Sequence, residues 1–129
     1  MPRDHLLLGV VLLLATLVLP VAFMTGKSLT GDEAAHLPAG FSYLVTHRIT
    51  LNPEHPPLIK ELCALPLLFL GVVMPMDQAT IEQGAHDRLY EWRFGREFFS
   101  GSDRDRLLFW GRVPAVLLSF ALAALILRC

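Results

Sequence analysis

Two long apolar runs limit what this chain can fold into. The first covers residues 6–23, reads LLLGVVLLLATLVLPVAF and contains no charged side chain. The second covers residues 107–127, and Arg112 is its only charged residue. A helix needs about 20 apolar residues to cross the ~30 Å hydrocarbon core of a bilayer. The sequence therefore predicts an all-α integral membrane protein, with transmembrane helices in residues 1–25 and 107–129.

A cleaved signal peptide is the alternative interpretation of the first run, because Arg3 precedes its apolar core. The apolar region of a signal peptide usually spans about 7–15 residues and is followed by an Ala-x-Ala cleavage site. This run is longer, and no such site follows it. We therefore expect a membrane helix, and both interpretations deliver the next segment outside the cytoplasm.

The charges near the ends of the two runs predict the orientation of the chain. Arg3 precedes the first run and Arg128 follows the second. Basic residues next to membrane spans favour the cytoplasmic side, whereas loops longer than about 60 residues translocate largely regardless of their own charge. Residues 26–106 hold 8 Lys or Arg and 11 Asp or Glu. We expect this long acidic loop to lie outside the cytoplasm.

Overall composition excludes some classes of function and bears on the extent of the chain. With a net charge of −1, the sequence has no basic patch of the kind that binds nucleic acid. Its two cysteines, Cys63 and Cys129, define neither a disulfide framework nor a metal site. Because the sequence stops directly after an apolar helix, we expect it to be the amino-terminal piece of a longer protein whose second membrane helix is truncated.

The loop begins with a helix start signal. Thr30-Gly-Asp-Glu33 has the form of a capping box, which predicts a helix over residues 31–46. An apolar stripe at helical spacing makes this helix amphipathic and suited to the membrane surface. Pro38 and Gly40 are expected to kink or interrupt it.

Two further surface helices are expected in the loop. Pro57 suits the first position of a helix over residues 57–73, which is too short and too rich in proline to span and is therefore expected to be interfacial or re-entrant. A third helix is expected over residues 82–99. Aromatic residues in this part of the loop would lie at the level of the lipid headgroups: Tyr90, Trp92, Phe94, Phe98 and Phe99. The pattern from Ser102 to Asp105 is a second capping box, expected to open the second membrane helix.

Polar residues cluster in two short parts of this apolar sequence. Asp32 and Glu33 begin the first surface helix, and His36 follows one turn later on the same face. Glu54 and His55 stand in LNPEHPPLIK, where prolines stiffen the chain. Carboxylates next to a low-dielectric boundary are strained unless they meet a cation, a metal or a proton donor. The structural alternative is that the first pair only caps a helix and Glu54 is a solvated loop residue.

A metal site is a further possibility for the same cluster. Its candidate ligands would be His36, His47, Glu54 and His55. No HExxH or other established ligand spacing supports this set. A divalent metal is therefore retained only as a possible cofactor, with Glu54 as a possible ligand.

Taken together, these motifs resemble those of a known enzyme family. An amino-terminal span is followed by Asp32-Glu33 at the head of a surface helix, then by Asn52-Pro-Glu-His-Pro-Pro-Leu58, and then by Arg112 entering the next span. This order is similar to the multispanning C-type (GT-C) glycosyltransferases. The similarity is greatest to the protein-mannosyltransferase-like group (glycosyltransferase family 39), which depends on a phospholipid carrier and is related to aminoarabinose transferases. The resemblance extends from the first helix to Arg112.

The resemblance implies a role for each matching position. Asp32 falls on the catalytic carboxylate, the general base that activates the acceptor, and Glu33 completes the pair as a catalytic or a positioning residue. Glu54 falls on an acidic residue of the active-site cavity, where it contacts a metal or the acceptor. His55 stands where relatives have a lysine that faces the donor phosphate. Arg112 matches a recurrent arginine that is either structural or in contact with phosphate, and His36 is taken with the substrate-binding residues.

The resemblance also implies the reaction and its location. A sugar on a polyprenyl phosphate would be moved to a lipid, glycan or protein acceptor at the outer face of a bacterial inner membrane, by a multi-pass enzyme embedded in membrane lipids. Relatives complete their active site with later spans, so the 129-residue piece is expected to be inactive alone. A non-catalytic two-span membrane protein with a binding or assembly loop is the alternative.

Overall fold

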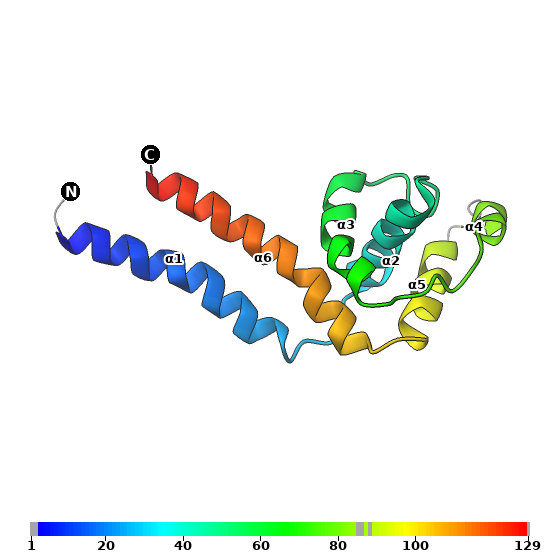
Figure 1. The fold of residues 1–129 in the computed structure, drawn as a ribbon, viewed down its shortest axis with the longest axis horizontal. Coiled ribbons are helices and arrows are strands. Elements are labelled where there is room, and N and C mark those ends of the chain that lie inside the picture. Colours follow the sequence, from blue (N-terminus) through cyan, green and yellow to red (C-terminus); the bar gives the residue numbers. More distant parts are fainter. Residues whose placement is uncertain (1–2, 85–86, 88, 129) are drawn as a thin grey trace.

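The computed structural model describes residues 3–84, 87 and 89–128, and this part of the chain is helical without any β-strand (Figure 1). The expected all-α class is confirmed. Its elements, in chain order, are α1 (Arg3–Met24), α2 (Gly31–Thr46), α3 (Pro57–Ala64), the short 3₁₀ helix η1 (Leu65–Phe69), α4 (Gln78–Gly84), α5 (Tyr90–Ser100) and α6 (Arg104–Arg128).

Helices α1 and α6 form an antiparallel pair that extends away from the other helices (Figure 1). Gly9, near the start of α1, lies against Leu127, near the end of α6. Both helices are long and apolar enough to cross a membrane, and only 6% of either apolar segment is buried within the molecule. The two apolar runs of the sequence thus form two long helices that expose most of their leucine and valine side chains.

The second long helix begins earlier than expected. It starts at Arg104 rather than at residue 107, and the Arg106 amide donates a hydrogen bond to the Asp103 carboxylate at 3.2 Å. Asp103 therefore caps the helix, in place of the expected Ser102. A carboxylate at this position also interacts favourably with the positive end of the helix dipole.

Helix α2 lies at the centre of the helices formed by the loop. Its predicted bounds and capping box are confirmed: the Glu33 amide donates to the Thr30 hydroxyl, and the Glu33 carboxylate accepts from the Thr30 amide. Residues 37–43 form a continuous buried run, so α2 is a core helix and not the membrane-surface helix that its amphipathic pattern indicated. Helices α3 and α5 cover it, and α6 meets its first half where Gly111 contacts Leu37 and Arg112 pairs with Glu33.

Of the two effects expected of Pro38, a kink or an interruption, the interruption does not occur, because α2 runs continuously from Gly31 to Thr46. A proline inside a helix leaves the carbonyl four residues earlier without its amide donor, here the carbonyl of Ala34. That oxygen packs closely against Gly95 of α5, where a Cβ atom would lie only 1.9 Å from it. Glycine at position 95 therefore allows α5 to cover the carbonyl that Pro38 leaves unpaired.

The other loop helices differ in length from their predicted ranges. The α-helix that begins at Pro57 ends at Ala64 and continues as a 3₁₀ turn only to Phe69, because Pro66 has no N–H for the α-helical ladder. In place of the helix expected over residues 82–99, α4 ends at Gly84 and α5 begins at Tyr90; residues 85, 86 and 88 of the expected range lie outside the described residues. A Cβ atom at Gly84 would meet the Tyr90 ring at 2.1 Å, so the end of α4 packs closely against the first residue of α5.

The aromatic residues of α5 have a different role from the one predicted. Tyr90, Phe94, Phe98 and Phe99 are buried in the core of the loop helices, and only Trp92 is exposed. Phe98 lies 5.5 Å from Phe41 of α2, measured between ring centroids. Packing of this kind stabilises a helix pair by about 1 kcal/mol beyond the area it buries. These rings hold α5 on α2 instead of anchoring the loop at lipid headgroups.

Candidate functional site

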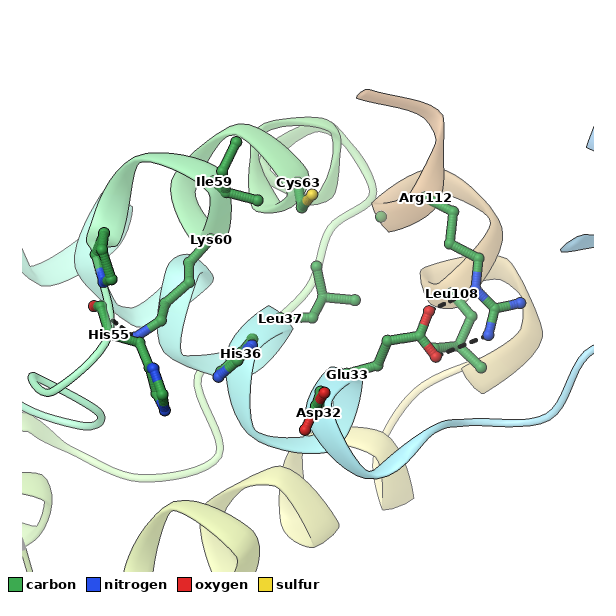
Figure 2. Close-up of a pocket in the computed structure, with 12 residues that line it drawn as sticks. Asp32, Glu33, His36, Leu37, His55, Ile59, Lys60, Cys63, Leu108 and Arg112 are labelled. Carbon is green, nitrogen blue, oxygen red and sulfur yellow. Dashed lines mark hydrogen bonds and ion pairs between the residues drawn. The ribbon is translucent and has the colours of Figure 1, made fainter. Parts of the chain in front are cut away.

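A pocket of about 400 Å³ opens where α2, α3 and the start of α6 meet (Figure 2). Five of the six predicted site residues line it: Asp32, Glu33, His36, His55 and Arg112. Glu54 does not, since it lies exposed on the loop before α3. Apolar side chains form the walls between the polar groups, namely those of Leu37, Pro56, Ile59 and Leu108. The pocket therefore has a charged rim and an apolar interior.

Asp32 stands in the first turn of α2, on the rim of the pocket and exposed to solvent. The capping box fixes where the helix begins and so fixes the position of this carboxylate. A carboxylate at the amino terminus of a helix interacts favourably with the positive end of the helix dipole. In Figure 2, Asp32 lies at the base of the same helical turn as Glu33 and one turn below His36.

Glu33 points away from Asp32 toward α6, and both of its carboxylate oxygens are hydrogen-bonded. Its two carboxylate oxygens accept hydrogen bonds from Nε and Nη2 of Arg112 at 2.6 and 2.8 Å, and one of them also accepts from Thr30. Partial burial alone would raise the pKa of Glu33, but the hydrogen bonds from Arg112 and Thr30 outweigh burial and hold the pKa below its usual value. This geometry supports a positioning role for Glu33.

Arg112 uses all five of its N–H donors within the chain. Besides Glu33, it donates to the carbonyls of Met24, Lys27 and Ser28 at 3.0–3.1 Å. It therefore connects the segment after α1, the start of α2 and the first half of α6. This arrangement leaves no N–H of Arg112 for a phosphate oxygen and supports the structural alternative for this residue.

His36 and His55 meet at the other end of the pocket. Their rings lie edge to face, with centroids 5.1 Å apart (Figure 2). Burial lowers the pKa of His36, and the nearby positive groups Lys60 and His55 lower it further, against the opposing effect of Asp32 and Glu91. The His36 imidazole is thus favoured in its neutral form, which can accept a hydrogen bond or a proton.

Lys60 is the pocket residue that sequence reasoning missed. It lies on α3 and is only 4% exposed, although lysine is rarely buried. Its ammonium donates to the backbone carbonyl and the side-chain oxygen of Asn52, and to the carbonyl of His55 at 3.1 Å. One feature of the sequence could have indicated it, because Lys60 stands in the largely apolar stretch that follows Pro56 and Pro57.

The four-residue metal set considered from the sequence does not assemble. His47 ends α2, and 11 residues of helix separate it from His36, or roughly 16 Å at 1.5 Å per residue. Among the described residues, no group of three or more His, Cys, Asp or Glu side chains is placed to hold a metal ion. The polar groups that line the pocket are the exposed Asp32 carboxylate, the imidazoles of His36 and His55, the Glu33–Arg112 ion pair, the Lys60 ammonium and the Cys63 thiol.

No protein-family model, curated protein or solved structure matches this chain.

Proposed function

We propose that this chain is part of a membrane glycosyltransferase, in which α1 and α6 span the bilayer and the pocket lies at its extracytoplasmic surface. The enzyme would move a sugar from a polyprenyl-phosphate donor to an acceptor. The observation that carries the proposal is the placement of Asp32, an exposed carboxylate, on an apolar-walled pocket beside α6. Such a pocket suits a ligand with an apolar lipid and a polar head.

The exposed surfaces of α1 and α6 support the membrane part of the proposal. A soluble monomer rarely exposes a continuous apolar patch larger than a few hundred Å². Here both long helices expose leucines and valines along most of their length. Hydroxyls within these helices donate to carbonyls of the same helix, as from Thr16 to Leu13 and from Ser119 to Ala115, so they leave no unpaired donor in lipid.

The proposed chemistry is a single displacement. Asp32 takes the proton of an acceptor hydroxyl or amine while the acceptor atom forms a bond to the anomeric carbon. The bond from that carbon to the phosphate oxygen breaks, its electron pair leaves with the polyprenyl phosphate, and the configuration at the carbon inverts. Because the leaving group is already a stable anion, the reaction needs no strong general acid. His36 and His55 would hydrogen-bond the sugar or the phosphate.

Replacing Asp32 by Asn tests this mechanism. Membranes that contain the full natural protein are supplied with radiolabelled hexoses and pentoses on polyprenyl phosphate, and label transferred to other membrane components is measured. Loss of a general base should slow transfer about 10²–10⁴-fold. Glu97→Gln is the matched control, because Glu97 is an exposed residue of α5 away from the pocket. Equal transfer by Asp32→Asn and wild type would remove Asp32 from the reaction.

The second candidate is a non-catalytic membrane protein whose loop helices bind a partner or support assembly. The exposure of Phe69, which is 87% accessible at the end of η1, favours it. This candidate predicts that wild-type membranes transfer none of the labelled sugars. It also predicts that joint replacement of Asp32, Glu33 and Glu54 leaves assembly unchanged.

A further inference from the structure

Hydrogen bonds from one buried cation, the Lys60 ammonium, hold the loop that carries Glu54 and His55. Asn52, at the start of this loop, is buried, and residues 53–55 are exposed. The Lys60 ammonium binds both ends: it donates to the Asn52 carbonyl at 2.6 Å, to the Asn52 side-chain oxygen, and to the His55 carbonyl at 3.1 Å. An ammonium has three N–H donors, so these bonds use its full capacity.

Asn52 is just as completely bonded as Lys60. It is 2% exposed, and its amide donates to the Tyr43 hydroxyl at 3.1 Å while its carbonyl accepts from the same hydroxyl at 2.9 Å. Its side-chain N–H donates to Glu91 of α5. The Tyr43 ring also lies beneath the ammonium, 5.5 Å from ring centroid to Nζ. Side chains from α2, α3 and α5 therefore converge on Asn52, at the start of the loop.

This network determines where the His55 ring lies. Because the His55 carbonyl is held by Lys60, the backbone from which the imidazole projects is fixed at the pocket rim (Figure 2). Pro56 and Pro57 follow directly and restrict the backbone on the other side. The His55 ring is then placed 5.1 Å from that of His36.

We propose that Lys60 is a positioning residue of the pocket, which holds the His55 imidazole against His36 by clamping both ends of the 52–55 loop. It touches no substrate itself, because its donors are already occupied. Burying a charge carries a large desolvation cost even when all of its hydrogen bonds are made. What such a group can provide in return is a unique local geometry. The benefit to sugar transfer rests on the proposed function, but the clamp itself does not.

Lys60→Met removes the ammonium while keeping a side chain of similar length, and NMR of the full chain in lipid nanodiscs measures the result. The expected outcome is loss of the cross-peaks between the His36 and His55 rings. The pKa of His36 should also rise, because the positive charge of Lys60 is removed while Asp32 and Glu91, which raise this pKa, remain, together with His55, which lowers it. Lys27→Met, at the only other lysine, is the control and should change neither signal. Unchanged ring cross-peaks in Lys60→Met would overturn the proposal.

A measurement on the unmodified protein covers the case in which Lys60→Met does not fold. The clamp requires that the Lys60 ammonium protons exchange slowly with water and show cross-peaks to Asn52 and His55. Rapid exchange without such cross-peaks would equally refute the clamp. Both readouts are made without any sugar donor, so their failure is distinguishable from failure of the transfer reaction.

Discussion

At the scale of single residues, the sequence motif Asp32-Glu33 divides into two different environments. Glu33 turns inward to the Arg112 guanidinium, and Asp32 stays on the pocket rim. The motif could be recognised from the sequence, since a capping box depends only on neighbouring residues. The division of roles could not, because Arg112 reaches Glu33 across 79 positions of the chain. Lys60 was missed for the same reason, since its network includes Glu91 of α5.

The Glu33–Arg112 pair predicts a pH-dependent component of stability. The folded pKa of Glu33 lies below its ordinary value of 4.5, so its contribution is complete above that pH and is lost as the pH falls through the lower folded pKa. Glu33→Gln should cost on the order of 1–2 kcal/mol at neutral pH. The gap between the two proteins should close as the pH falls below 4.5 and through the lower folded pKa of Glu33.

Thermal unfolding in detergent, followed by circular dichroism, measures this gap. Glu82→Gln is the matched control, because Glu82 pairs with Arg48 on the exposed surface and the pair is screened by water. If the difference in thermal stability between Glu33→Gln and the wild type stayed the same at every pH, the assigned role of the pair would be wrong.

At the scale of elements, glycines set how closely the helices approach. A Cβ atom at Gly40 of α2 would lie 2.1 Å from the Lys60 carbonyl oxygen of α3, and one at Gly111 of α6 would meet Leu37 at 2.7 Å. These contacts could not be predicted from the sequence, where Gly40 reads as a helix breaker. The bounds of α2 could be predicted, because its cap and stripe are local. The end of α3 at Ala64 was not predicted, because the apolar pattern continues to residue 73 although Pro66 ends the α-helix.

Gly40→Ala should therefore separate α2 from α3 and destabilise the loop helices. Forcing a methyl group into a packed contact typically costs about 1–3 kcal/mol, and here the obstacle is backbone, which yields less than a side chain. The thermal midpoint measured in detergent should fall accordingly. Gly26→Ala is the control, because nothing lies within 4 Å of its Cβ position. If both substitutions had the same small effect, the close α2–α3 approach would be wrong.

At the scale of the whole molecule, the arrangement joins two long apolar helices to a small helical core at one end (Figure 1). The sequence predicted both long helices from length and composition alone. It did not predict the pocket, which needs α6 to pack against α2 and α3, elements about 70 and 50 residues earlier in the chain. Under the proposed function, this position at the base of α6 would bring the pocket's polar groups next to a lipid-borne ligand.

Cys63 offers the most direct measurement of the central claim, that this pocket lies at the outer membrane surface and holds a lipid-linked sugar. Cys63 is a free thiol that lines the pocket, and burial followed by the charge of Glu33 raises its pKa, so labelling is run at mildly alkaline pH. In a Cys129→Ser background, a membrane-impermeant maleimide added to intact cells should label Cys63. Polyprenyl-phosphate sugar, but not the polyprenol alone, should slow the labelling in isolated membranes. Labelling only after permeabilisation, or at a rate indifferent to the donor, would contradict the account.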